Sequence, residues 1–360
     1  MDTKVRVISF YLPQFYPTPE NDDWWGPGFT EWTNVARCHP LFKGHYQPRV
    51  PGELGFYDLR LPLIREQQAE LAKKAGIEGF CYWHYWFGNG KRLLDQVFRE
   101  VVESGKPDFP FCLCWANHSW SAKTWNPNVP DKMLIEQKYY GEEDYIAHFN
   151  EMLPAFKDPR YMKQNGKLIF GIFDPVFFTD FCTFKRIWNE LAHKNGLEGF
   201  CFFALVQESV NLQRFNLTDY DEIVYDALQD FYKDYQNSFI KSKLRNLRVN
   251  HFHKPYVREY ADYVKESLTW FKKYPDFIPC IDPDFDHSPR SAHRWIVLNG
   301  STPGLFRDLC DKIKKLVEMP QRQNNLLFVK AWNEWGEGNY LEPDIKWGRG
   351  YIEAMNNVFR

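Results

Sequence analysis

Short runs of apolar, β-branched and aromatic residues alternate along the chain with longer segments in which apolar residues recur at helical spacing. This alternation is typical of parallel strands joined by crossover helices. Some runs, such as FCFFAL at residues 200–205, are apolar at every position, as expected for strands covered on both faces. The predicted strands suit a closed eight-stranded barrel and span residues 5–11, 79–85, 111–116, 168–173, 199–205, 222–226, 277–282 and 326–332.

An internal similarity supports repeated units. The segment ELAKKAGIEGFC at residues 70–81 closely matches ELAHKNGLEGFC at residues 190–201. In each, a helix can end on a glycine that accepts the left-handed conformation, and a buried strand starts a few residues later. Convergent helix-capping chemistry would produce the same likeness, so the match indicates two helix-to-strand junctions without establishing a duplication.

The length of 360 residues fits one (β/α)8 TIM-like barrel of about 250 residues plus elaborated βα loops. No long Gly/Ser/Pro-rich linker divides the chain, so we expect residues 1–360 to form a single catalytic domain. Residues 26–51 and 117–131 are irregular and proline-bearing, and we predict that they are the elaborated loops. Residues 232–256, rich in Lys, Arg and Asn, predict an exposed excursion between the sixth and seventh strands.

The composition indicates which classes of binding partner to expect. The formal net charge is -2 and basic residues form no long runs, which argues against nucleic acid as a partner. Aromatic residues make up 18% of the chain, and many of the 14 Trp lie beside Gly, Pro, Asn or Glu in predicted loops. Such rings pack on the C–H faces of sugars, although a large apolar core would also use them. We therefore expect an oligosaccharide or polysaccharide partner.

Cysteine and histidine usage indicates no metal centre. Most of the eight Cys have apolar neighbours and predict buried free thiols. No second Cys pair accompanies CLC at residues 112–114, and neither His-Glu-x-x-His nor a Gly-rich phosphate cradle occurs, so we predict no catalytic metal and no cofactor. The absence of an apolar leader and of a long apolar run predicts no membrane span and a cytoplasmic location.

The sharpest chemical feature follows the last predicted strand. That strand leads into WNEWGEG at residues 332–338, which delivers Glu334 and Glu337 into a Gly-containing, Trp-flanked turn. In a parallel barrel the working groups come from the carboxyl ends of the strands. Glycosidic cleavage commonly needs one protonated and one ionised carboxyl group, and close like charges push the two pKa values apart. We predict that this pair is catalytic rather than a solvated acidic turn.

Polar and aromatic residues at or near other strand ends are weaker candidates for contact with a sugar. Some of them we expect to pack behind the others. The predicted substrate-binding residues are Tyr11, Trp25, His84, Trp86, Asn117, Trp120, Asp174, Asp286 and Asn333.

Together these segments resemble the WbsX-type, glycoside hydrolase family 99-like proteins of bacterial polysaccharide loci. The resemblance covers nearly the whole chain. It is carried by YLPQF (11–15), NDDWWG (21–26), GFTEWTNV (28–35), GHYQP (44–48), LGFYD (54–58), GFCYWHYWF (79–87), CWAN (114–117) and WNEWGEGNYLE (332–342). One departure lies at His118, where many relatives carry a glutamate after Trp-Ala-Asn, so we expect the subsite chemistry to differ there.

The resemblance implies a barrel related to retaining, metal-independent endo-α-mannosidases. By that analogy Glu334 is the base that deprotonates the substrate 2-hydroxyl, which attacks C1 to give a 1,2-anhydro sugar. Glu337 is then the acid/base for the leaving group and water. Back-side attack by O2 requires O2 and the leaving oxygen to be trans, which fits an α-manno- or rhamno-configured glycan.

Two other functions stay open. The WbsX branch is often described as a polysaccharide-biosynthesis glycosyltransferase, and DPDFD at residues 282–286 would then be a metal site for a nucleotide diphosphate. That spacing is common in turns. An inactive glycan-binding barrel is the third reading, against which the retained Glu334 and Glu337 argue.

Overall fold

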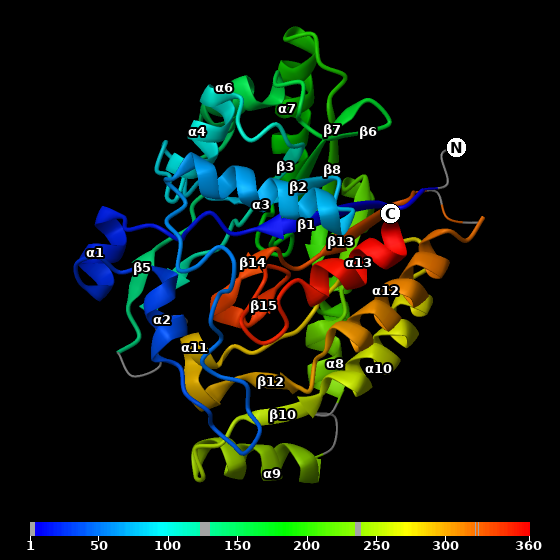
Figure 1. Ribbon diagram of the computed structural model, residues 1–360. Helices are drawn as coiled ribbons and strands as arrows, with labels where there is room; N and C mark the ends of the chain where they lie inside the picture. The colour runs from blue at the N-terminus through cyan, green and yellow to red at the C-terminus, as the bar shows by residue number, and fades with distance from the viewer. Residues whose placement is uncertain (1–3, 123–129, 235–238, 321, 323) are drawn as a thin grey trace.

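The computed structural model describes residues 4–122, 130–234, 239–320, 322 and 324–360. Its centre is a closed barrel of eight parallel strands (Figure 1). The strands are β1 (Arg6–Tyr11), β2 (Gly79–His84), β3 (Phe111–Trp115), β7 (Lys167–Ile172), β8 (Phe200–Val206), β9 (Glu222–Asp226), β11 (Ile278–Ile281) and β13 (Leu326–Val329). Their order is β3-β2-β1-β13-β11-β9-β8-β7, and pairing of β3 with β7 closes the ring. The predicted fold class and all eight predicted strands are confirmed.

Helices surround the barrel and cover the outer faces of the strands (Figure 1). They are α3 (Pro62–Ala75), α4 (Gln96–Ser104), α6 (Glu142–Phe156), α7 (Phe181–Lys194), α8 (Leu228–Asp234), α10 (Tyr260–Lys273), α12 (Pro303–Val317) and α13 (Gly350–Phe359). Between β8 and β9 the described chain has only the short 3-10 turns η1 (Ser209–Gln213) and η2 (Leu217–Asp219) in place of a helix. Strands such as β2 and β8 are buried at every position, because the barrel interior and the helices cover both faces.

The two matching segments are both helix-to-strand junctions, as predicted. Helix α3 ends at Ala75, is followed by Gly76 with φ of 80°, and β2 begins at Gly79. Helix α7 ends before Gly196, which has φ of 76°, and β8 begins at Phe200. A glycine accepts this left-handed conformation without strain, so the chain can turn sharply from each helix into the sheet.

Insertions after the strands are more structured than expected. Residues 26–51 contain α2 (Glu31–Arg37) after the preceding α1 (Pro19–Trp25), so the prediction of a wholly irregular loop was wrong there. Helix α2 forms because it buries Trp32 and Val35 against the barrel rim. The excursion at residues 232–256 carries α9 (Phe239–Asn250), which lies at the edge of the molecule (Figure 1).

Small strand pairs complete the loops. They are β4 (Trp120–Ser121) with β5 (Met133–Ile135), β10 (Tyr256–Glu259) with β12 (Ile296–Asn299), and β14 (Asn333–Glu334) with β15 (Asn339–Tyr340). In addition, β6 (Lys163–Gln164) pairs antiparallel with the start of β7. Two short elements, α11 (Ser288–Ser291) and η4 (Ala292–Arg294), follow β11. Residues 123–129 of the predicted 117–131 loop lie outside the described residues. In the part of the chain that is described, no helix is both long and apolar enough to cross a membrane.

Candidate active site

A cavity opens at the carboxyl ends of the barrel strands. It encloses about 1020 Å³ of empty space, including solvent at its mouth, and we call it the rim cavity. Segments that follow all eight strands line it, in chain order through Leu12, Tyr85, His118, Phe173, Gln207, Gln229, Phe285 and Glu334. Glu337 lines it too. This is the face on which barrel enzymes place their chemistry.

Both glutamates are held by a tight turn after β13. Glu334 ends β14, and Glu337 ends the 3-10 turn η5 (Trp335–Glu337). Gly336 is required between them, because a Cβ there would lie 1.9 Å from Glu31 Oε1. Gly338 has φ of 62° and lets the chain return into β15. The turn therefore brings two carboxylates to one wall of the rim cavity.

Arg290 links Glu334 and Glu337 to Glu31, the first residue of α2. Its Nη1 lies 2.5 Å from Glu337 Oε1, and its Nη2 lies 3.5 Å from Glu334 Oε2. Its Nε and Nη2 also donate to the two oxygens of Glu31, at 2.9 and 3.2 Å. Glu31 in turn accepts from Gln14, and its side chain is fully buried. One guanidinium thus organises three buried carboxylates.

Lys330 supplies a second buried cation at the end of β13. Its side chain is 7% exposed and lines the rim cavity. The ammonium lies 3.6 Å from Asp226 Oδ2 and 3.9 Å from Glu337 Oε2. Both distances exceed a hydrogen bond, so Lys330 acts on these carboxylates through its charge.

The surroundings shift the pKa values of the two glutamates in opposite directions. Burial, together with the charge of Glu337, raises the pKa of Glu334 to about 7, although Arg290 and Lys330 oppose this. Burial alone would raise the pKa of Glu337 as well, but Arg290 and Lys330 outweigh it, and the pKa of Glu337 is lowered. Trp83 Nε1 also donates to Glu334 Oε1 at 2.8 Å. Between the two pKa values a single proton on the pair therefore resides mainly on Glu334.

Two imidazoles face Glu337. Burial lowers the pKa of His118 to about 4 and that of His287 to about 4, so both rings are neutral at pH 7. His287 Nε2 lies 3.9 Å from Glu337 Oε1. The Nδ1 atoms of both rings are buried without a hydrogen-bond partner among the described residues. Neutral rings with a spare ring nitrogen suit hydroxyl groups.

Among the predicted substrate-binding residues, Trp120 lines the rim cavity. Asp174 lines a smaller cavity that shares Phe173 and Gln207 with it. Asn117 is buried and joins the loops after β3 and β7 through hydrogen bonds to Asp174 N and O at 2.7 and 2.8 Å. Asn333 is buried and makes the same kind of double bond to the backbone of Leu12.

Other predicted residues face away from the rim cavity. Tyr11 donates to Gln68 of α3 at 2.7 Å, on the outer side of the barrel. His84 lies 2.7 Å from His148 of α6, and Trp86 stacks on that ring at 4.5 Å. Trp25 is half-buried and packs on Phe29 at the rim, outside the cavity lining. Alternate residues of an extended chain point to opposite faces, so Trp83 of β2 and Tyr85 directly after it line the rim cavity instead.

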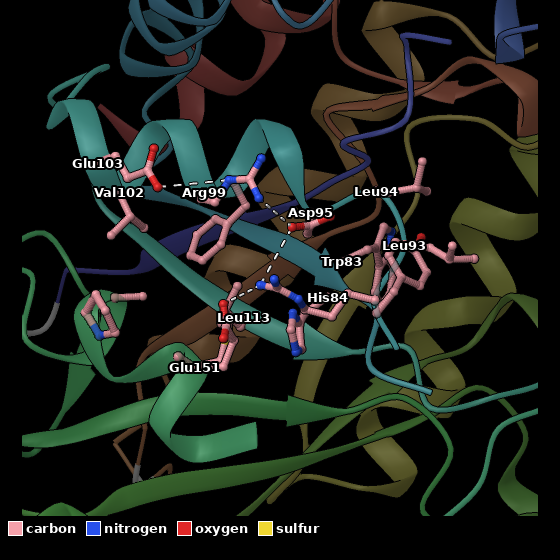
Figure 2. Close-up of a pocket in the computed structure, with 16 residues that line it drawn as sticks. Trp83, His84, Leu93, Leu94, Asp95, Arg99, Val102, Glu103, Leu113 and Glu151 are labelled. Atoms are coloured by element: carbon pink, nitrogen blue, oxygen red, sulfur yellow. Dashed lines mark hydrogen bonds and ion pairs between the residues drawn. The ribbon is translucent and has the colours of Figure 1, made fainter. Parts of the chain in front are cut away.

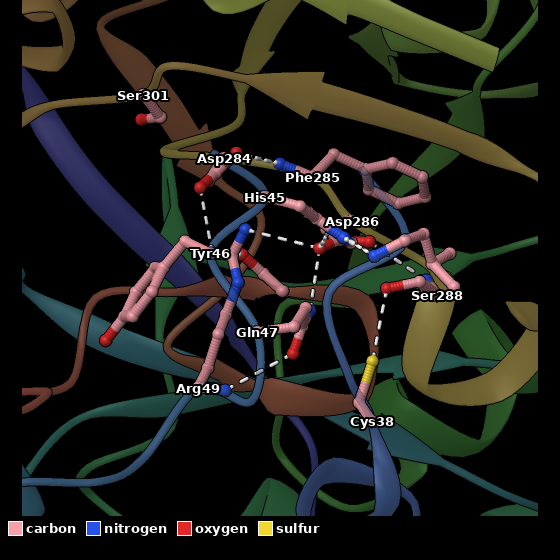
Figure 3. Close-up of polar contacts among 12 residues, drawn as sticks. Cys38, His45, Tyr46, Gln47, Arg49, Asp284, Phe285, Asp286, Ser288 and Ser301 are labelled. Atoms are coloured by element: carbon pink, nitrogen blue, oxygen red, sulfur yellow. Dashed lines mark hydrogen bonds and ion pairs between the residues drawn. The ribbon is translucent and has the colours of Figure 1, made fainter. Parts of the chain in front are cut away.

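Asp286 belongs to a buried polar cluster behind the turn (Figure 3). Its Oδ2 accepts from Gln47 at 2.6 Å and lies 2.8 Å from His45 Nε2. Asp284 accepts from Arg49 at 2.8 Å. The side chain of Asp286 has no exposed surface, and neither acid lines the rim cavity. Asp286 therefore lies outside the cavity that Glu334 and Glu337 line.

Sequence reasoning missed the cations. Lys330 is a charged residue within an otherwise apolar strand end, which is a usable signal of a site. Arg290 and Glu31 are 259 positions apart, so no local pattern pairs them.

Comparison with known proteins places the chain in a family. Residues 7–355 match the family model described as "Glycosyltransferase WbsX". The chain belongs to the WbsX family. "Uncharacterized protein WxcX" of Xanthomonas campestris pv. campestris is 33% identical over 358 residues, and its counterpart in strain B100 is 32% identical over 355. Both alignments cover 98% of this chain and 49% of the relative, so the WbsX chain spans about half the length of these relatives.

Solved structures share the fold. A "Glycoside hydrolase-like protein" superposes with a TM-score of 0.63 and 12% identity, over 99% of this chain and 94% of the other. The glycoside hydrolase family 99 endo-α-mannosidase from Bacteroides thetaiotaomicron superposes with a TM-score of 0.56 and 16% identity, over 100% and 96%. The WbsX chain therefore has a glycoside hydrolase-like barrel, and the resemblance stated from its motifs is confirmed for family and fold.

Proposed function

We propose that this WbsX chain is a retaining, endo-acting glycoside hydrolase for α-manno- or rhamno-configured glycans. The observation that carries the proposal is the pair Glu334 and Glu337 on one wall of the rim cavity, with pKa values shifted in opposite directions. One carboxyl group that holds a proton beside one that has lost it is what glycosidic cleavage requires.

The proposed reaction has two steps. Glu334 removes the proton from the 2-hydroxyl, O2 bonds to C1, and the bond from C1 to the leaving oxygen breaks as Glu337 donates a proton to that oxygen. Water then bonds to C1 of the 1,2-anhydro sugar as the C1–O2 bond breaks; Glu337 takes the proton from the water, and Glu334 returns the proton to O2. Two inversions at C1 give net retention.

The charges of the substrate-free site bear on these roles. Activity in this scheme needs Glu334 ionised and Glu337 protonated, whereas Arg290 and Lys330 favour the opposite arrangement before substrate binds. The active form is then a minor protonation state of the pair, which carries the reaction within the pH range between the two pKa values. A pKa near 7 suits Glu334 as a general base.

A glycosyltransferase is the second candidate, because the matching family model carries that description. The DPDFD acids are each engaged elsewhere: Asp282 by Tyr263 and Asn339, Asp284 by Arg49, and Asp286 by His45 and Gln47. Across the described residues, no three His, Cys, Asp or Glu side chains are grouped as metal ligands would be. This run therefore lends the transferase candidate no support.

The test is a digest of α-mannan and α-rhamnan polysaccharides, with product mass and anomeric configuration followed by NMR. We expect reducing oligosaccharides with retained configuration, without added nucleotide sugar or metal. Glu334→Gln and Glu337→Gln are the controls, and both should release strongly reduced amounts of product. Inverted products would exclude the anhydro-sugar route, and strict dependence on a nucleotide sugar would establish the transferase.

A further inference from the structure

A second cavity lies on the outer side of β2, between the barrel and helices α4 and α6 (Figure 2). We call it the lateral cavity. It encloses about 700 Å³ of empty space, including solvent at its mouth. Trp83 and Tyr85 of the β2 segment line both cavities, so this strand separates the lateral cavity from the rim cavity.

The walls of the lateral cavity are mainly apolar. They are formed by Leu93, Leu94, Phe98, Val102, Leu113 and Met152. Interiors are normally close-packed, and an apolar space that side chains leave unfilled forgoes their dispersion contacts. An apolar molecule that enters regains those contacts, so the walls favour an apolar occupant.

Ion pairs join partly exposed side chains that line the lateral cavity (Figure 2). Arg92 lies 2.5 Å from Glu151 and 3.6 Å from Asp95, while Arg99 lies 3.4 Å from Asp95 and 3.9 Å from Glu103. Two cations are paired with three acids, so no positive charge is left for an anionic ligand, and the apolar walls disfavour burial of a cationic one. The pairs are partly exposed and individually weak, so they can part to admit a neutral molecule.

One buried polar group faces this apolar space. His84 is 7% exposed and lines the lateral cavity. Its Nε2 is paired with His148, whereas no hydrogen bond within the described chain engages its Nδ1. Burial lowers the pKa of His84 to about 3, so the ring is neutral and Nδ1 can make one hydrogen bond.

We propose that the lateral cavity binds a small, uncharged and mainly apolar molecule that carries one hydroxyl or carbonyl group. The apolar body packs against the α4 and α6 walls, and the polar group bonds to His84 Nδ1. This site is independent of the proposed glycan chemistry, because it lies on the other side of β2 from Glu334.

The experiment titrates the full chain with 4-fluorophenol and with 4-fluorotoluene, followed by fluorine NMR. We expect saturable binding of one molecule per chain, with the phenol bound about 2- to 10-fold more tightly because of one hydrogen bond. In His84→Leu that preference should disappear. Val102→Phe, which fills the cavity from α4, should weaken both probes at least about 5-fold, the loss expected for blocking an apolar site.

Trp120→Ala, in the rim cavity, is the matched control and should leave both affinities unchanged. Circular dichroism checks the folding of each variant, and Ala155→Leu fills the same cavity from α6 if Val102→Phe does not fold. Absence of saturable binding, or binding that Trp120→Ala abolishes and the filling variants spare, would overturn the site. An unchanged phenol preference in His84→Leu would overturn the role of His84.

Discussion

Two acidic clusters follow neighbouring strands of the barrel and touch each other. Asp284 and Asp286 come after β11, whereas Glu334 and Glu337 come after β13. Asp286 N donates to Glu337 O at 2.6 Å, so the two clusters are in contact through their backbones. Both are closely spaced acids at strand ends, yet only the glutamates line the rim cavity.

The difference lies in how completely each carboxylate is satisfied. Burial would raise the pKa of Asp286, but the bond with His45 and the charge of Arg49 lower it to about 2. Glu334 accepts from the neutral donor Trp83 and has only a long contact of 3.5 Å with Arg290, and burial together with the charge of Glu337 raises its pKa to about 7. Full pairing makes an acid inert and structural, whereas partial pairing beside a cavity leaves it able to exchange a proton.

Replacing the glutamates gives the largest expected effect. Glu334→Gln and Glu337→Gln should each lower kcat/KM on a cleavable glycan by about 10²- to 10⁴-fold, because each removes a proton-transfer group. The free energy of unfolding, from denaturant titration, should change little in Glu334→Gln, whereas Glu337→Gln should also lower it, because Glu337 is paired with Arg290 at 2.5 Å. A large loss of stability with unchanged turnover would show that the two glutamates are structural and not catalytic.

Asp286→Asn should affect mainly the stability of the fold. It breaks a buried charge cluster and should lower the free energy of unfolding by about 3–5 kcal/mol in the same titration. Asp58→Asn is the control, because Asp58 pairs with Arg60 on the surface, and its loss should change stability by about 0–1 kcal/mol. Equal effects of the two substitutions would show that the cluster behind the turn is not structural.

The pH dependence of activity sharpens the comparison. Below the lowered pKa of Glu337 both glutamates are protonated, and above the pKa of about 7 of Glu334 both are ionised. We expect a bell-shaped profile of kcat/KM with its alkaline limb near pH 7. Arg290→Gln removes the cation that lowers the pKa of Glu337, so the acid limb should move to higher pH. Arg60→Gln should leave both limbs in place, and an unmoved acid limb in Arg290→Gln would contradict the assignment.

The smallest expected effect concerns the aromatic residues. Trp120 lines the rim cavity and Trp25 does not. Trp120→Ala should raise KM for an oligosaccharide by about 2- to 10-fold through loss of ring packing. Trp25→Ala should leave KM within error, and the reverse result would place the glycan over α1 instead.

Much of the architecture was determined by the sequence alone. Apolar runs alternating with helical segments predicted the eight strands and the closed barrel, because covering both faces of a parallel strand demands apolar residues throughout. Glycines at the two matching junctions predicted the turns from helix to strand. The WNEWGEG turn, next to the last strand, predicted where Glu334 and Glu337 lie, and the motifs predicted the WbsX family.

Only the tertiary structure decided which side chains share a cavity. A strand that is buried at every position carries no signal for its inward face, so the sequence predicted His84 and Trp86 as site residues, whereas Trp83 and Tyr85 face inward. The acidity of each carboxylate depends on partners such as Arg290, Lys330 and Arg49, which chain folding brings from distant segments. Burial and charge act through space, so the same acidic spacing gives a structural cluster after β11 and a titratable pair after β13.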